Sequence, residues 1–520
     1  MIDSLTFALL TGIIFVYYIV PERQNTKIKE RNTKMNINMK RATSMLLLAA
    51  ILTASASCGS TPSGNNDIPD GQEQSTETTS GETTSPLYDL EKKDYGGRDF
   101  RISVNKKYED EMWVEEENAD VCNDAVYNRN IKVEDYLNIK IKTVPSESET
   151  VQVSDISKNL MAGDDVYDLT AVYTYLAGGP ALQGFYYTWK DIPVVDFSKE
   201  WWVTDANEAF NINGNQYVAV GDLSITTLLL SYAVFFNQRI AEANQFPDLY
   251  QTVLDGKWTI DTLIDLSKDM YQDINGDGKT DEGDSYGFAA DKVTNLDAWT
   301  TAFDIPLTKK DDKGSPAACI DLGKTQTAIE KVYSLYYDTK TYLTNGDGKE
   351  IEVFANGNTA FLTTWINNSF STLRAMKDDY GILPYPKFDE NQKNYYSNSM
   401  DNYSLLSVPK TVQDTEFVGR VTEALTRENH FSVVPAYYDV ALTSKYARDE
   451  QSVAMLDIIM NGRMYDFSIL HSGELSNLPY LFRNMIRDKK TNIASEYAKI
   501  ETKVNEGLKK LTEEYAALGN

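Results

Sequence analysis

The chain has 520 residues, a formal net charge of −27 and 42% hydrophobic residues. Such an acidic surface repels phosphate backbones and anionic lipid headgroups, so we expect neither nucleic-acid binding nor docking of the protein surface on a membrane. The length exceeds that of a usual single domain, which predicts a folded part with two lobes.

The first apolar stretch covers residues 5–20 and is followed by a basic polar stretch over 23–34. This apolar stretch is either an extra membrane segment or not part of the protein at all. In the second case the start codon was assigned too early, and translation begins at Met35 or Met39. We favour the later start because every feature needed for export is present from Met39 onward.

The second apolar stretch has the features of an export signal. Basic residues lie within 39–41, an apolar run covers 45–54, and the small residues 55–57 precede Cys58. The run is too short to span a bilayer, so residues 1–57 are predicted to be a cleaved signal. Cysteine at this place resembles a bacterial lipobox, whose thiol is acylated, although the lipobox usually has an aliphatic residue where this chain has serine. We expect lipidation of Cys58; a plain secretory signal with an incidental cysteine is the alternative.

Residues 58–87 have the composition of a linker. Positions 59–87 consist almost wholly of Ser, Thr, Gly, Pro, Asn, Asp and Glu. Too few apolar residues are present to offset the entropy lost on ordering, which predicts a disordered tether between the lipid and the folded part.

Folded sequence is predicted from about Asp99, with a β–α–β pattern. Apolar residues alternate at 100, 102 and 104 as in a half-buried strand, share one helix face at 126, 133 and 137, and alternate again at 139 and 141. A helix over 156–161 and an apolar strand over 166–172 follow, separated by a turn. This order predicts an α/β sheet with parallel strands.

Helices are predicted to dominate later in the chain. Thr259 is a candidate N-cap for a helix over 260–270. Apolar residues at 497, 500, 504, 508, 511 and 515 would form one face of a long C-terminal helix. The chain has no repeat of fixed period, which excludes a solenoid.

Residues 273–284 match the twelve-residue calcium loop of EF-hands. Oxygen-bearing side chains occupy positions 1, 3, 5, 9 and 12, position 7 offers its carbonyl, and Gly278 at position 6 permits the sharp turn. The predicted ligands of a structural Ca²⁺ are Asp273, Asn275, Asp277, Lys279, Asp281 and Asp284. An Asp/Gly-rich turn without metal is the alternative.

A second copy of the central pentapeptide provides an internal contrast. Residues 345–349 repeat Asn-Gly-Asp-Gly-Lys, but Leu343 stands where the first aspartate would be needed. This copy therefore predicts only a turn.

The sequence contains no recognisable catalytic motif. His430 and His471 lie outside any metal or nucleophile motif, and phosphate loops, nucleophile elbows and zinc signatures are lacking. Cys122 and Cys319 are too few for a disulfide framework and lack metal-ligand spacing. Paired carboxylates of a glycoside hydrolase stay open as an alternative among the 77 acidic residues.

Several segments, in the same order along the chain, resemble the extracellular solute-binding proteins of ABC importers, the large family that includes maltose-binding protein. They are 213–220 (NGNQYVAV), 233–240 (AVFFNQRI), 257–263 (KWTIDTL), 285–288 (SYGF), 354–361 (FANGNTAF) and 381–386 (GILPYP). The resemblance implies an α/β, two-lobe, type II periplasmic-binding-protein-like fold with a ligand cleft between the lobes.

The resemblance also implies lobe boundaries, with crossings near Asp222, Asp401 and Pro435. The N-terminal lobe would comprise 88–222 and 400–433, and the C-terminal lobe 223–399 and 434–520.

In such a cleft, aromatic rings are the natural lining for sugars, because the apolar C–H faces of a sugar stack on them. Trp365 is the first candidate, since the family commonly presents a stacking tryptophan there; a tryptophan in the lobe core is the alternative. Tyr173 and Tyr175 follow the predicted strand 166–172 and are expected at the edge of the cleft. Further candidates are Phe236, Asp401, Asn402, Tyr437 and Tyr438.

The function implied by the resemblance is that of a substrate-binding lipoprotein, not an enzyme. We expect it to be a monomer, lipid-anchored on the outer face of the cell membrane, that delivers a solute, expected to be an oligosaccharide, to ABC permease subunits. The alternatives are a surface glycan-binding lipoprotein without a transporter and an extracellular glycoside hydrolase.

Overall fold

The computed structural model describes residues 86–443 and 450–519. By their contacts, these described residues belong to one compact unit. The predicted signal, Cys58 and the tether up to residue 85 lie outside the described residues. Leu87, placed at the end of the tether by the sequence, is 1% exposed and lies in the 3-10 helix Pro86–Asp89. It packs in the core of the first sheet, so ordered packing begins earlier than the predicted start at 88.

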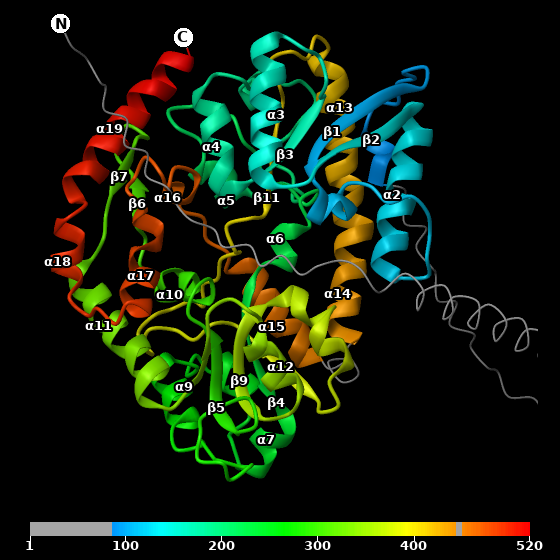
Figure 1. Cartoon of the computed structure of the whole chain (residues 1–520). Coiled ribbons are helices and arrows are strands. Elements are labelled where there is room, and N and C mark those ends of the chain that lie inside the picture. Colours follow the sequence, from blue (N-terminus) through cyan, green and yellow to red (C-terminus); the bar gives the residue numbers. More distant parts are fainter. Residues whose placement is uncertain (1–85, 444–449, 520) are drawn as a thin grey trace, which may run out of the picture. The chain divides into compact units, whose positions relative to one another are not determined.

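The first sheet follows the predicted β–α–β order (Figure 1). Its strands, in spatial order, are β11 (Ser404–Ser407), β3 (Leu169–Tyr173), β1 (Arg98–Asn105) and β2 (Ile139–Ser146). Strand β1 runs parallel to β2, with Phe100 opposite Ile141, and parallel to β3, while β11 is antiparallel to β3.

Helices cover both faces of this sheet. Helices α2 (Val121–Leu137) and α13 (Thr415–Glu428) bury their apolar side chains against Phe100 and Ile102. Helix α3 (Glu149–Ala162) covers the other face, where the Gln152 amide donates to the Ala171 carbonyl. Phe100 and Ile102 pack as the alternation predicted, but Ser103, Val104 and Asn105 are all buried as well, so β1 is covered on both faces and is not the half-buried strand that was expected.

Local capping sets the ends of these helices. Asp120 accepts hydrogen bonds from the first N–H groups of α2, and Ser148 does the same for α3. Helix α3 ends at Gly163 with φ of 77°, a conformation that favours glycine. The helix predicted over 156–161 is thus the second half of a longer one.

The second sheet is mixed. Its strands, in spatial order, are β10 (Tyr380–Leu383), β4 (Tyr232–Asn237), β9 (Thr359–Trp365), β5 (Tyr286–Asp291) and β8 (Tyr342–Thr344). All residues of β4 and β5 are buried, because α9 and α11 cover one face and α12 and α15 the other (Figure 1). A separate hairpin pairs β6 (Thr308–Lys310) with β7 (Pro316–Ala318).

The remaining helices are α4 (Thr174–Leu182), α5 (Thr204–Ala209), α6 (Thr226–Leu229), α7 (Gln238–Ala243), α8 (Leu249–Leu254), α9 (Ile260–Ser267), α10 (Ala298–Ala302), α11 (Leu322–Tyr333), α12 (Lys349–Ala355), α14 (Val434–Thr443), α15 (Glu450–Asn461), α16 (Phe467–Leu470), α17 (Leu481–Arg487), α18 (Ile493–Ala498) and α19 (Glu501–Leu518). Within the described residues, no helix has both the length and the apolar character needed to cross a bilayer.

Two of these helices test the expectations for the later part of the chain. Thr259 caps α9 as predicted, by accepting from the Thr262 N–H, although α9 ends at Ser267 and is shorter than expected. The predicted C-terminal helix is instead two helices, α18 and α19, with the break at Lys499 and Ile500.

The chain passes from the first sheet to the second between β3 and β4 and returns between β10 and β11. The two crossing segments touch, because the Met400 N–H donates to the Leu230 carbonyl at 2.9 Å and Ser231 pairs with Ser399.

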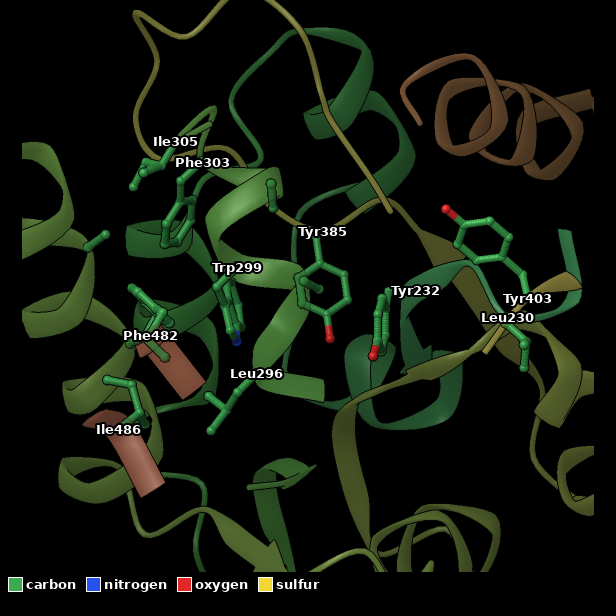
Figure 2. Close-up of a cluster of buried hydrophobic side chains, with 14 of the residues drawn as sticks. Leu230, Tyr232, Leu296, Trp299, Phe303, Ile305, Tyr385, Tyr403, Phe482 and Ile486 are labelled. Carbon is green, nitrogen blue, oxygen red and sulfur yellow. The ribbon is translucent and has the colours of Figure 1, made fainter. Parts of the chain in front are cut away.

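An aromatic core adjoins these crossings. Figure 2 shows Tyr232, Tyr385 and Trp299 side by side, and the ring centroids of Trp299 and Tyr385 are 4.9 Å apart. Phe482 and Ile486 of α17 join the same cluster, so the C-terminal helices pack on elements of the second sheet.

The C-terminal helices also reach α4, which follows the first sheet's β3. The backbone of α4 comes so close to Leu470 that only glycine fits at position 178. A Cβ added to Gly178 would lie 2.3 Å from the Leu470 carbonyl oxygen. The assignment of 434–520 to the second lobe stays a prediction, since these helices contact elements next to both sheets.

Candidate ligand-binding site

A cavity of about 530 Å³ lies at the carboxyl ends of the parallel strands of the first sheet. Strand β1 ends at Asn105, β2 is followed by Glu147, and β3 ends at Tyr173. This end of a parallel sheet is where open α/β folds bind ligands. Its lining residues are Asn105, Lys107, Glu147, Glu149, Tyr173, Tyr175, Met400, Asp401, Asn402, Ser472, Asn477, Tyr480 and Arg483.

Backbone hydrogen bonds between α4 and the returning crossing place the two predicted tyrosines in this cavity. The Tyr175 N–H donates to the Asp401 carbonyl at 3.3 Å, and the Thr174 N–H donates to the Tyr403 carbonyl at 3.1 Å. The rings of Tyr173 and Tyr175 lie with centroids 6.4 Å apart. The Tyr173 hydroxyl is buried without a hydrogen-bond partner. Such a group is normally satisfied by water or a ligand.

The opposite wall is polar and comes from the returning crossing and the C-terminal helices. The Tyr480 hydroxyl donates to the Asp401 carboxylate. Arg483 lies over the Tyr480 ring, 4.2 Å from its centroid, and donates to Asp297 at 2.7 Å. Arg483 is therefore held in place by a carboxylate and an aromatic ring before any ligand binds.

Burial dominates the electrostatics of the cavity. It raises the pKa of Asp401, while the Tyr480 hydrogen bond and the Arg483 charge oppose the rise. Burial also raises the pKa of Tyr175 to about 12, so its hydroxyl stays a neutral donor. The lining carries the carboxylates of Glu147, Glu149 and Asp401 and the cations of Lys107 and Arg483, so it has no strong excess of either sign.

Four of the eight predicted ligand-binding residues meet in this cavity: Tyr173, Tyr175, Asp401 and Asn402. These four residues come from segments that are far apart in the chain, and the structure brings them into one cavity. Their roles in ligand binding stay predictions. Asn402 presents a buried side-chain oxygen without a hydrogen-bond partner.

The other four do not line this cavity. Trp365 is half-buried at the end of β9, with its ring centroid 6.3 Å from that of Tyr232. Phe236 is 6% exposed and packs on Tyr250.

Both tyrosines of α14 lie apart from the cavity as well. Tyr437 contacts the Phe370 ring, and Tyr438 lines a separate cavity of about 200 Å³ with Asp222 and His430. The cavity of about 530 Å³ at the ends of β1, β2 and β3, called the main cavity below, is lined by neither of these tyrosines nor by Trp365, so a ligand confined to it would not contact them.

Nine residues that line the cavity were not predicted from the sequence. Asn105 and Glu147 could have been found, because each lies where a predicted parallel strand ends. Tyr480 and Arg483 carry no such signal, since only tertiary packing brings α17 to the first sheet. The others missed are Lys107, Glu149, Met400, Ser472 and Asn477.

The two histidines lie outside the cavity. His430 hydrogen-bonds Asp222 through Nδ1, and this bond raises its pKa. His471 is buried beside Tyr515, and burial lowers its pKa. Each histidine thus makes one hydrogen bond to a residue that is distant in the chain.

The predicted calcium loop connects α9 to β5. Asp273 accepts from the N–H groups of Gly276 and Gly278 at 2.7 and 3.0 Å. Across residues 86–443 and 450–519, no three His, Cys, Asp or Glu side chains are gathered closely enough to hold a metal ion. Calcium binding therefore stays a prediction.

No family model matches the chain, and neither does any curated protein. Among the solved structures that match is the crystal structure of a cyclo/maltodextrin-binding protein complexed with maltotetraose, with a TM-score of 0.50 and 13% sequence identity. The match covers 80% of this chain and 97% of that chain. At this identity the similarity is one of fold. The chain has the α/β, two-lobe type II periplasmic-binding fold, and the predicted fold class is confirmed.

Proposed function

We propose that this protein is a non-enzymatic, extracellular solute-binding protein that holds a neutral oligosaccharide in the main cavity. The observation that carries the proposal is the meeting of Tyr173 and Tyr175 with Asp401, Asn402 and Arg483 at the carboxyl ends of the first sheet. The fold, shared with a structure solved with maltotetraose, supports the same class of ligand.

The chemistry of the lining fits a sugar. Aromatic rings pack against the apolar faces of sugar rings, whereas carboxylate, amide and guanidinium groups exchange hydrogen bonds with hydroxyls. The near balance of charge does not favour an anionic solute. A volume of about 530 Å³ lies within the usual range of small-molecule sites, about 300–1,000 Å³.

We further propose that the mature chain is a monomer that begins at an acylated Cys58 and delivers its solute to the permease subunits of an ABC importer. The order of export signal, cysteine and polar linker supports the anchor at the outer face of the membrane. The acidic composition supports attachment through the lipid alone, without nucleic-acid partners.

The test is a screen of neutral oligosaccharides, including maltotetraose, by thermal unfolding and calorimetry. A bound sugar should raise the free energy of unfolding by about 2.7 kcal/mol at about a hundredfold excess over its Kd. Tyr175→Ala should weaken binding by about 1–3 kcal/mol, the magnitude of base stacking on aromatic rings. Tyr127→Ala, a half-buried tyrosine of α2 outside the cavity, is the matched control and should bind normally.

Two outcomes would reject the proposal. The first is that no saccharide stabilises the chain; the second is equal affinity in Tyr175→Ala and the unchanged chain. Analysis of the sugar after long incubation separates binding from hydrolysis, because a glycoside hydrolase would cleave it. A glycan-binding lipoprotein without a transporter would bind the sugar but support no uptake. Trp365→Ala in the same assay tests the first sequence-based candidate.

A further inference from the structure

We propose that the loop over residues 273–284 binds a calcium ion that fastens it to the second sheet. The inference is independent of the proposed function, since the loop lines no part of the main cavity. The spacing of the oxygen groups in this loop matches a calcium loop at every ligand position except the twelfth, where Asp stands in place of Glu.

The observation that points to a ligand is the environment of Asp284. Its side chain is fully buried, at 0% exposure, and its Oδ1 has no hydrogen-bond partner. Its Oδ2 accepts from the Asp281 N–H at 3.2 Å and from the Tyr271 hydroxyl at 3.0 Å. A buried carboxylate oxygen without a partner is costly, and a cation would remove that cost.

The neighbours of Asp284 include another expected ligand. The Tyr271 hydroxyl also lies 3.2 Å from the carbonyl oxygen of Lys279, the backbone ligand at position 7. Positions 7 and 12 therefore meet at one hydroxyl group, which occupies the place between two oxygen ligands.

Positions 3 and 9 are also close together. A Cβ added to Gly283 would lie 2.5 Å from Nδ2 of Asn275 and 3.1 Å from Oδ1 of Asp281. The loop is thus curled so that four of the six ligand positions already lie in two adjacent pairs.

The carboxylates of the described loop are not gathered around one point, so a calcium ion would have to draw them together by side-chain rotation. Asp273 and Asp277 now accept from backbone N–H groups of the loop, at 2.7–3.0 Å. Each carboxylate would turn an oxygen toward the ion, and the Tyr271 hydroxyl would move aside. A set made wholly of oxygen atoms suits calcium rather than zinc, and the shorter Asp at position 12 favours modest affinity.

The loop is bonded to the second sheet, which gives the ion a structural role. The Tyr286 hydroxyl at the start of β5 donates to the Asp281 carbonyl at 2.6 Å. Glu282 forms an ion pair with Lys349 at the start of α12. Calcium would hold these contacts in place without touching the sugar site.

The experiment is calcium titration of the chelator-treated chain by calorimetry, together with thermal unfolding at increasing calcium. We expect saturable binding of a single ion and a rise in Tm. Asp277→Ala, an exposed position, should lower calcium affinity by about tenfold or more. Asp284→Asn should also weaken binding, because it removes the buried charge.

The chain contains its own matched control. Asp347 lies in an identical Asn-Gly-Asp-Gly-Lys sequence, 345–349, that lacks the first aspartate. Asp347→Ala should bind calcium like the unchanged chain. No heat and no rise in Tm at millimolar calcium would overturn the proposal, and so would equal losses in Asp277→Ala and Asp347→Ala. Saccharide affinity should be the same with and without calcium.

Discussion

Glu111 connects both crossing segments to the first sheet through one buried carboxyl group. It ends the 3-10 helix Lys106–Glu111, which follows β1, and is 4% exposed. Its Oε2 accepts from the N–H and hydroxyl of Thr226 at 3.1 and 2.8 Å, and its Oε1 accepts from the Ser404 hydroxyl. Thr226 begins α6 in one crossing, and Ser404 begins β11 after the other.

Burial raises the pKa of Glu111 from 4.5 to about 7, against the opposing effects of Ser404, Thr226 and the nearby Arg129 charge. Since the folded-state pKa lies above the unfolded one, the folded chain keeps a proton that the unfolded chain loses between these values. The free energy of unfolding therefore falls as pH rises from about 4.5 to about 7 and levels off above. A change of one in pKa corresponds to about 1.4 kcal/mol, so Glu111 contributes at most about 3.5 kcal/mol to this fall in the free energy of unfolding.

Denaturant unfolding of the unchanged chain and of Glu111→Gln, from about pH 5 to about pH 8, measures this contribution. As pH rises over this range, the free energy of unfolding of the unchanged chain should fall by up to about 3 kcal/mol relative to that of Glu111→Gln. Glu115→Gln, an exposed glutamate, is the control and should show no such shift. Parallel pH profiles for Glu111→Gln and the unchanged chain would show that the Glu111 carboxyl does not cause this pH dependence.

Two further predictions concern the polar wall and the anchor. Arg483→Met removes the cation that pairs with Asp297, whose side chain is 12% exposed, so it should lower the free energy of unfolding by about 3–5 kcal/mol and also weaken sugar binding. Denaturant unfolding with calorimetry checks both effects, and unchanged stability would contradict the pairing. Cys58→Ala should release the chain from membranes, and mass spectrometry of membrane-extracted protein should find acyl chains on Cys58; retention of the variant or an unmodified cysteine would rule out the anchor.

Local patterns predicted those elements whose cause is local. The cap at Thr259 depends on a neighbour three residues away, and the alternation at Phe100 and Ile102 is visible within the strand itself, although the helix α13 that covers it is distant in the chain. The break between α18 and α19 could not be predicted, because apolar spacing continues through Ile500 while the backbone turns. Leu87 was assigned to the tether because its neighbours are polar, yet it packs in the core.

The cavity was predictable to the extent that strand ends form it. Tyr173 and Tyr175 were found because they follow a strand, and Asn105 follows the same rule. Tyr480 and Arg483 reach the cavity only because α17 packs on the aromatic cluster of the second sheet, a contact without a sequence pattern. Trp365 was selected by resemblance, and its packing beside Tyr232 could not be deduced from its neighbours in the chain.

The most direct test of the proposed function is a crystal structure of the chain with the saccharide that stabilises it most. We predict an intact sugar in the main cavity, with a ring against Tyr173 or Tyr175 and hydroxyls hydrogen-bonded to Asp401 and Arg483. A sugar bound elsewhere, such as the cavity of about 300 Å³ lined by Tyr465 and Asp466, would contradict it. A cleaved sugar in the main cavity would contradict it as well, since a binding protein must release its solute unchanged.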